Sequence, residues 1–267
     1  MFKFSKSKIL YFYLSFIFYK VIIIFECSKG FLTIYLAEAI WLFRAITKQN
    51  SLFYLKLPFF SEVFNTKFGK FNINPDLMNI FIVSPAFERQ DLNYLMKQIE
   101  KEFITSKSIL FVDIGASFGK YTIALGNKFK RKKLNIISFE PDAAIYSPNS
   151  FSLLKKNVAE NKIKNAKLYK IGIGQKNIIK NNVKIKTLAS VIGKNNFKKY
   201  GAVFIKLDID DYVIDGLKGI EECVRNGSKT YLFVEDCVKK DKVLAYLRKN
   251  KYAFVDKLTP YNSFWLK

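Results

Sequence analysis

The sequence predicts an α/β fold with a mainly parallel sheet, and three observations lead to this prediction. Short apolar segments alternate with longer amphipathic segments over residues 109–267. The first apolar segment runs into a glycine-containing turn and then a helix-forming segment, as at the start of a β-α-β unit. Only residues 258–261 separate the last two apolar segments, which is too few for the crossover helix that parallel strands need.

Each element follows from hydrophobic periodicity. Strands are expected at 109–114, 134–140, 167–173, 202–209, 230–236, 252–257 and 262–266. Helices are expected near 119–130, 148–161, 212–225 and 239–250. We therefore expect a seven-stranded sheet in which six strands are parallel and the last is antiparallel.

Residues 61–108 are expected to form an accessory hairpin and helix. Strands are predicted at 67–73 and 80–84 around the turn Asn74-Pro75-Asp76. Residues 88–105 place apolar side chains on one face of a helix. The predicted boundaries between segments are thus at residues 60 and 108.

The N-terminal segment, residues 1–60, is apolar and aromatic. Lysines precede an apolar run at 9–25, and a second run covers 31–46. The first run is slightly short for a spanning helix, which needs about 20 residues. No small-residue cleavage site follows Phe25, which disfavours a signal peptide. Two interpretations stay open: membrane contact through residues 9–46, or buried helices that pack on the rest of the chain or on a second subunit.

The composition is strongly basic. The formal net charge is +23, and only five of the 45 basic residues are arginines. The functional interpretation of such a charge is that the protein binds nucleic acid or an anionic membrane. We favour compositional drift toward lysine, and expect no nucleic-acid partner, because phosphate-reading surfaces more often use arginine.

The residue types also restrict the chemistry. There is no histidine, and Cys27, Cys223 and Cys237 show no C-x-x-C spacing. This argues against a zinc site and excludes Ser-His-Asp and Cys-His catalytic groups, so we expect no metal. A general base must then be a carboxylate, a lysine, a tyrosine or water. The odd cysteine count favours a reducing compartment, so we expect a cytoplasmic protein, with the cytoplasmic face of a membrane as a possible attachment.

The first predicted strand ends at a glycine turn. Residues 111–119 read Phe-Val-Asp-Ile-Gly-Ala-Ser-Phe-Gly, with Asp113 at the end of the strand. Glycine permits positive φ and close approach of a ligand, and open α/β sheets bind ligands at the carboxyl ends of their strands. The spacing of Gly115 and Gly119 departs from the G-x-G-x-x-G fingerprint, and no P-loop Gly-Lys-Ser/Thr follows.

The second strand ends in an acid, Glu140, followed by Pro141 and Asp142. An acid in this place can accept hydrogen bonds from both hydroxyls of an adenosine ribose. Asp142 is expected near the adenine edge or as a cap of the next turn. The pattern indicates a nucleoside cofactor, and the alternative is a β-turn with a solvated carboxylate.

Two later strands also end in acids. Asp208 follows Lys206 in the fourth strand, and Glu235 comes before Asp236 in the fifth. We expect Asp208 to orient an acceptor hydroxyl or take its proton, with Lys206 on the same side by strand alternation. Glu235 is the second candidate, and Asp236 is expected on the other face. The alternative is that Asp208 only caps a turn.

Residues 109–267 resemble the FkbM family of S-adenosylmethionine-dependent methyltransferases. The matching stretches, in chain order, are Asp113–Gly119 with Lys120-Tyr121-Thr122, Ser138–Pro141, Leu153–Asn157 with Asn161, Ile205–Asp208, Leu217–Gly219 and Phe233–Glu235. Matches in this order are more specific than a single glycine turn. Ser84–Arg89 resembles a segment often found just upstream in the family.

The resemblance implies the class I methyltransferase fold, S-adenosylmethionine as cofactor, and O-methylation of a hydroxyl on a sugar, glycolipid or natural-product-like acceptor. It implies cofactor contacts from Glu88, Asp113, Gly115, Ala116, Ser117, Gly119, Tyr121, Glu140, Pro141 and Asp142. Catalysis is assigned to Asp208, Lys206 and Glu235.

The chain departs from the family pattern on the substrate side. Asp208-Ile209-Asp210-Asp211 stands where the family usually has Asp-x-Glu-Gly, and Leu188-Ala189 where Leu-Asp is common. Two alternatives are kept. One is an RNA methyltransferase, although the Asp/Asn-Pro-Pro-aromatic motif of base amino-methylation is missing. The other is an inactive methyltransferase fold that acts as a membrane or assembly protein.

Overall fold

The computed structural model describes residues 63–267 except 75–76, 85–86, 143–148, 237–238 and 260. The apolar runs predicted at 9–25 and 31–46 lie outside the described residues. Among the residues described, no helix is both long and apolar enough to cross a membrane. The chain divides into two compact units, residues 1–89 and 90–267, and each is described by itself.

In the first unit, a short hairpin is followed by a short helix. Strands β1 (Val63–Thr66) and β2 (Gly69–Asn72) pair antiparallel, and α3 covers Leu77–Val83. The strand predicted at 67–73 overlaps β2, but the predicted hairpin is wrong, because β2 pairs with β1 and the segment predicted as the second strand, 80–84, ends a helix. A short apolar run has no periodicity that separates a buried strand from a buried helix.

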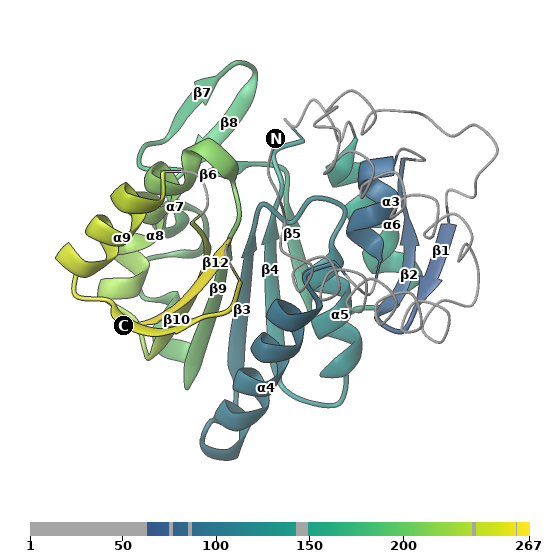
Figure 1. The fold of residues 1–267 in the computed structure, drawn as a ribbon, viewed down its shortest axis with the longest axis horizontal. Helices are drawn as coiled ribbons and strands as arrows, with labels where there is room; N and C mark the ends of the chain where they lie inside the picture. Colours follow the sequence, from purple (N-terminus) through teal and green to yellow (C-terminus); the bar gives the residue numbers. More distant parts are fainter. Residues whose placement is uncertain (1–62, 75–76, 85–86, 143–148, 237–238, 260) are drawn as a thin grey trace, which may run out of the picture. The chain divides into compact units, whose positions relative to one another are not determined.

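The second unit is built on a seven-stranded sheet with the order β11-β12-β10-β9-β3-β4-β5 (Figure 1). Its strands are β3 (Ile109–Ile114), β4 (Leu134–Phe139), β5 (Ala166–Tyr169), β9 (Ala202–Leu207), β10 (Thr230–Glu235), β11 (Ala253–Lys257) and β12 (Asn262–Leu266). Only β12 runs antiparallel to its neighbours β10 and β11. The predicted class I methyltransferase sheet, with an antiparallel last strand, is therefore confirmed.

Helices cover both faces of this sheet. Side chains of α7 (Leu188–Ile192), α8 (Val213–Arg225) and α9 (Lys240–Lys249) join one core cluster with alternate residues of the strands. On the other face lie α4 (Arg89–Thr105), α5 (Lys120–Lys128) and α6 (Ser150–Glu160). There, the ring of Tyr121 lies 6.0 Å from that of Phe233, and the ring of Phe103 lies 5.6 Å from that of Phe129. Helix α4 thus belongs to the second unit, whereas the sequence analysis places it in the accessory segment.

A small three-stranded sheet interrupts the alternation after β5. It consists of β6 (Gly172–Ile173), β7 (Ile178–Lys180) and β8 (Val183–Lys186), in the order β6-β8-β7. Asn181 and Asn182, the two residues that join β7 to β8, both have positive φ, as in a type I′ hairpin turn. The predicted strand at 167–173 is in fact divided between β5 and β6.

The turn after β3 is fixed by its close approach to the end of β9. The Asp208 N–H donates to the Ile114 carbonyl at 3.1 Å. Gly115 has φ +82°, and a Cβ there would overlap the Asp208 carbonyl oxygen. Packing of the chain on itself is therefore enough to require glycine at this position.

Gly115→Ala should lower the free energy of unfolding by at least about 3 kcal/mol, because backbone strain and overlap with a rigid carbonyl add together. Gly193→Ala is a matched control, since Gly193 has φ +84° and open space where the Cβ would lie. It should cost only the strain of a backbone conformation, φ +84° and ψ 137°, that residues other than glycine rarely adopt, about 1–3 kcal/mol. Denaturant unfolding of both variants measures the difference, and equal losses would contradict the packing of Gly115 on β9.

Candidate functional site

The candidate site lies at the carboxyl edge of the sheet, where β3, β4, β9 and β10 all end. These strands are parallel and in register, with Asp113 level with Ser138 of β4 and with Lys206 of β9. Acids that are far apart in sequence are therefore brought to one edge, as expected for an open α/β sheet.

The glycine turn is held by the end of β4. The N–H groups of Gly115 and Ala116 both donate to the Phe139 carbonyl at 3.0 Å, and the Ser117 N–H donates to Glu140 Oε2 at 2.8 Å. Asn157 of α6, fully buried, donates to the Phe118 carbonyl at 2.8 Å. The turn is thus preformed by contacts within the chain.

Glu140 is buried and already accepts three hydrogen bonds. Its Oε1 accepts from the Asp142 N–H at 2.8 Å and from Ser150 Oγ at 3.0 Å, while Oε2 accepts from Ser117. A carboxylate offers about four acceptor positions, so one remains for a ligand hydroxyl. Burial raises the pKa of Glu140, and the hydrogen bonds from Asp142, Ser117 and Ser150 only partly offset this effect.

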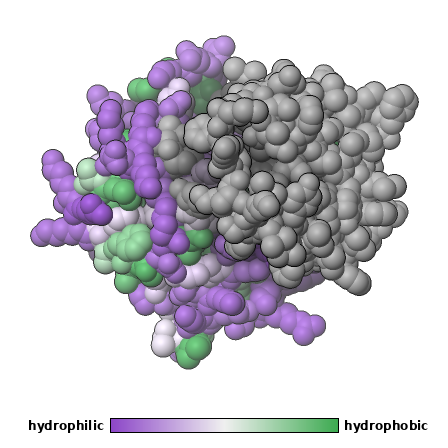
Figure 2. All heavy atoms as spheres, in the orientation of Figure 1, coloured by the Kyte–Doolittle hydropathy of each residue, from purple (hydrophilic) through white to green (hydrophobic). Residues whose placement is uncertain are grey.

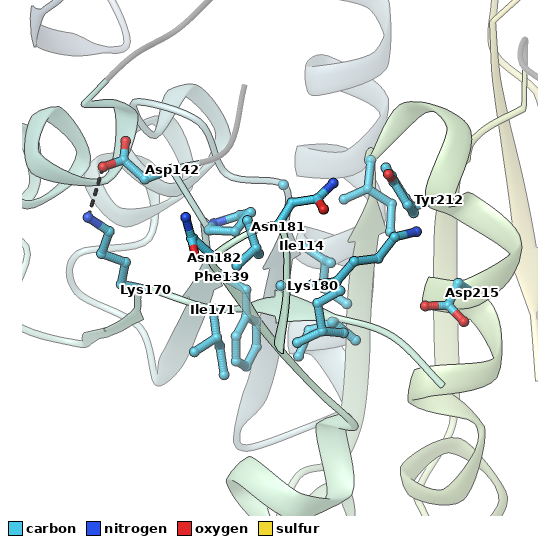
Figure 3. Close-up of a pocket in the computed structure, with 17 residues that line it drawn as sticks. Ile114, Phe139, Asp142, Lys170, Ile171, Lys180, Asn181, Asn182, Tyr212 and Asp215 are labelled. Carbon is cyan, nitrogen blue, oxygen red and sulfur yellow. Dashed lines mark ion pairs between the residues drawn. The ribbon is translucent and has the colours of Figure 1, made fainter. Parts of the chain in front are cut away.

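A cavity of about 550 Å³ opens beside this turn (Figure 3), within the range of roughly 300–1,000 Å³ that is usual for small-molecule sites. Its walls include Ile114, Gly115, Phe139, Pro141, Asp142, Lys170, Ile171, Lys180, Asn181, Asn182, Ile209, Tyr212 and Asp215. Three predicted cofactor residues, Gly115, Pro141 and Asp142, therefore line one cavity.

An ion pair borders one end of the cavity. Lys170 Nζ lies 3.0 Å from Asp142 Oδ2. Partial burial raises the pKa of Asp142, but the bonds from Lys170, the Phe151 N–H and Ser150 outweigh this and the net pKa is lowered. Asp142 also accepts from the Phe151 N–H at 3.2 Å, so it both caps the start of α6 and faces the cavity.

The tip of the β7–β8 hairpin forms another wall of the cavity, which was not predicted from the sequence. Lys180, Asn181 and Asn182 line the cavity, and Lys180 Nζ lies 5.3 Å from the ring centroid of Tyr212, in the turn η3 (Asp210–Tyr212) (Figure 3). The signal was an Asn-Asn pair between two short segments, of which only the second, Val183–Lys186, alternates apolar and polar residues.

The predicted catalytic residues come together next to the cavity. Lys206 Nζ lies 2.5 Å from Asp208 Oδ2, and Glu235 forms a side-chain hydrogen bond with Asp208. The Lys206 side chain is only 4% exposed and that of Asp208 is 33% exposed. Burial raises the pKa of Asp208, but the Lys206 charge and the two hydrogen bonds outweigh it, so the net pKa is lowered. The neighbouring Lys206 ammonium therefore favours the ionised form of Asp208.

Asp113 and Tyr121 lie on the side of this acidic group and do not line the cavity. Asp113 Oδ2 accepts from Thr122 Oγ1 at 2.7 Å, which ties β3 to α5. Asp113 Oδ1 is buried and has no hydrogen-bond partner among the described residues. The ring of Tyr121 lies 4.8 Å from Lys206 Nζ. Both residues are thus neighbours of Lys206: Asp113 is level with it on the adjacent strand, and the Tyr121 ring contacts its ammonium group.

The remaining predicted cofactor residues are not part of the cavity wall. Ala116 and Ser117 belong to the turn held by β4, and Gly119 has φ +98° and a position where a Cβ would overlap Leu154. Glu88 has φ +50° and is half-buried in the first unit, so it is not placed in this site. Among the described residues, no three His, Cys, Asp or Glu side chains gather closely enough to hold a metal ion.

Comparisons with known proteins gave only distant structural matches. No protein-family model and no curated protein matches the sequence. A solved FkbM methyltransferase from Methylobacillus flagellatus KT is 20% identical, with a TM-score of 0.47 over 60% of this chain and 44% of that one. The chain thus spans less than half the length of that protein.

Two further solved structures are similar at lower identity. An rRNA methylase from Streptococcus thermophilus is 12% identical, with a TM-score of 0.37 over 60% of this chain and 86% of that one. A methyltransferase from Geobacter sulfurreducens is 11% identical, with a TM-score of 0.42 over 67% and 79%. The assignment of the fold rests on the strand order and directions described above.

Lys206→Met should raise the pKa of Asp208, because burial would then act without the neighbouring positive charge. In the unsubstituted protein the lowered pKa gives stability that is complete above the ordinary value of 3.8 and is lost as pH falls through the lowered folded value. Carboxyl-carbon NMR titration measures the pKa directly. Lys257→Met, which removes the partner of Asp236, is the control and should leave Asp208 unchanged. An unaltered Asp208 in Lys206→Met would contradict the pairing.

Proposed function

We propose that this chain is an S-adenosylmethionine-dependent methyltransferase of the FkbM type, which methylates a hydroxyl group on a sugar, glycolipid or natural-product-like acceptor. One observation carries the proposal. At Gly115 the wall of the cavity meets the backbone of Asp208. A donor bound in the cavity and an acceptor held by the Lys206, Asp208 and Glu235 group would then be neighbours.

The residues present fit this cofactor. Phe139, Ile171 and Ile209 give the cavity apolar surface suited to an adenine ring. Glu140 does not line the cavity itself but lies between Phe139 and Pro141, which do, and it has one acceptor position left for a ribose hydroxyl.

The main contribution of the protein to the reaction would be to position the acceptor hydroxyl relative to the methyl donor. S-adenosylmethionine supplies a methyl group on a sulfonium, which a nucleophile can accept in an in-line displacement. Asp208 is ionised beside Lys206 and accepts a hydrogen bond from a hydroxyl acceptor, which orients its oxygen. The lowered pKa makes Asp208 a weak base, so it orients the hydroxyl more than it removes the proton.

A sugar-like acceptor is supported by the charged group at the ends of β9 and β10. Lys206, Asp208 and Glu235 offer donors and acceptors of the kind that bind hydroxyl-rich molecules. Mass spectrometry of glycans and lipids from cells with and without the gene tests this class. A methyl group missing only from a nucleic acid would contradict it.

Glu140→Gln should weaken binding of S-adenosylmethionine about tenfold to a hundredfold, because a charge-assisted hydrogen bond to the ribose is worth roughly 1.5–3 kcal/mol. Calorimetry measures the affinity, and Glu222→Gln on the exposed side of α8 is the control.

The same assignment predicts a pH dependence. Affinity should fall with falling pH through the raised pKa of Glu140, at a higher pH than the ordinary 4.5 of a glutamate, and this step should be absent in Glu140→Gln. Unchanged affinity in the variant would remove Glu140 from the cofactor site.

Asp208→Asn should reduce the rate of methyl transfer about 10²-fold or more, the usual scale for an acid–base or orienting group. Affinity for S-adenosylmethionine should change little, because the cofactor contacts lie mainly on β3 and β4. Transfer of label from S-adenosylmethionine to a glycan and lipid extract gives the rate. Asp211→Asn makes the same chemical change on a side chain that is 71% exposed and serves as the control. Near-normal turnover in Asp208→Asn would shift the role to Glu235.

A further inference from the structure

Charge is distributed unevenly between the two edges of the seven-stranded sheet. Exposed basic residues occupy the segments that enter its strands: Lys107 before β3, residues 130–133 (Lys-Arg-Lys-Lys) before β4, Lys162 and Lys164 before β5, and Lys198 and Lys199 before β9. We call this the amino edge, since the parallel strands begin there. Figure 2 shows mainly hydrophilic residues on the described part of the face that it draws, with smaller hydrophobic areas between them.

The acids gather at the opposite, carboxyl edge. Strands β4, β9 and β10 are followed or ended there by acids, among them Glu140, Asp142, Asp208, Asp211 and Glu235. Lysines are present at this edge too, but Lys170 and Lys239 are paired there with Asp142 and Asp211. At the amino edge, Glu100 and Glu102 are engaged with Lys128 and Lys229 at 2.9 and 2.7 Å. Residues 130–133 form no ion pair within the described part of the chain.

An exposed isoleucine lies within this basic surface. Ile104, in the last turn of α4, is 83% exposed, more than any other large hydrophobic side chain described. The end of α4 lies beside residues 130–133, because Lys132 Nζ is 5.0 Å from the ring centroid of Phe103. Lys101 and Lys107 flank Ile104 in sequence, and both are exposed.

We propose that the amino edge docks on an anionic lipid surface, with the lysines of residues 101–107 and 130–133 at the headgroups and Ile104 among the acyl chains. Anionic leaflets attract clustered lysines without requiring any fixed geometry. An exposed aliphatic side chain flanked by lysines has the character of an interfacial membrane contact.

These observations favour lipid over nucleic acid as the polyanion. Single-stranded nucleic acid is held by stacking on aromatic rings, and arginine is preferred for bidentate phosphate contacts. At this edge the highly exposed hydrophobic residue is aliphatic, and residues 130–133 contain one arginine and three lysines. The inference uses only surface charge and exposure, so it is independent of the proposed activity.

Vesicle binding of the full chain tests the proposal. Vesicles of phosphatidylcholine alone are compared with vesicles containing roughly one-third phosphatidylglycerol, at low and high salt. One variant replaces Lys130, Arg131, Lys132 and Lys133 with glutamine. The matched control replaces four exposed lysines away from the amino edge, Lys176, Lys184, Lys240 and Lys242, so both variants lose the same net charge. Equal unfolding midpoints confirm that each variant is folded.

The amino-edge variant should lose about tenfold or more of its affinity for the anionic vesicles, while the control stays within about twofold of the unsubstituted protein. Ile104→Ser should also weaken binding, whereas Ile179→Ser, at an isoleucine 76% exposed on β7, should not. Equal losses in the two charge variants, or binding that does not depend on phosphatidylglycerol, would overturn the proposal. So would RNA binding that only the amino-edge variant loses while its vesicle binding is unchanged.

Discussion

The arrangement of the site depends on the contact between the Gly115 turn and the end of β9. Strand β3 is buried along its whole length between β4 and β9, and the Asp208 N–H bonds to the Ile114 carbonyl. The backbone of Asp208 then lies so close to Gly115 that no side chain fits there. Because of this contact, the cavity wall and the acidic group at the end of β9 share one boundary.

The acidic group is in turn stabilised by a buried lysine. Lys206 is almost completely buried in the centre of the sheet, where an unpaired ammonium would be costly. Asp208 pairs with it directly, and Asp113 lies level with it on the neighbouring strand. An ionised acid at the end of β9 is therefore required by the charge of Lys206, whatever the acceptor.

The sequence was sufficient to predict the strands that are buried on both faces, because such strands are written as long apolar runs. Strands such as β3 and β9 are of this kind, and their ends could be located to within a residue or two from the apolar pattern of the sequence. The prediction failed for α3, because seven mostly apolar residues fit a strand as well as a helix. The hairpin β7–β8 was missed because its strands are short and exposed, so its pattern is weak. That Lys180 and Asn182 line the cavity depends on how the hairpin folds over the sheet, which no local pattern encodes. The Lys206–Asp208 pair could be predicted, since strand alternation alone puts both side chains on one side.

The difference in charge between the two edges of the sheet argues against compositional drift as the whole explanation of the basic composition. Drift would add lysines to every exposed segment alike, whereas a parallel sheet separates strand beginnings from strand ends in space. Acids follow the strand ends and basic residues precede the strand beginnings, as with Asp208 after β9 and Lys199 before it. The strands of six residues place these edges about 20 Å apart. Lysines at the carboxyl edge, such as Lys170 and Lys239, are paired with acids, so an anionic surface is attracted more strongly by the amino edge and leaves the candidate site facing water. This orientation favours an acceptor hydroxyl that is soluble, or carried on a glycan extending well beyond the headgroups, over one at the bilayer surface itself.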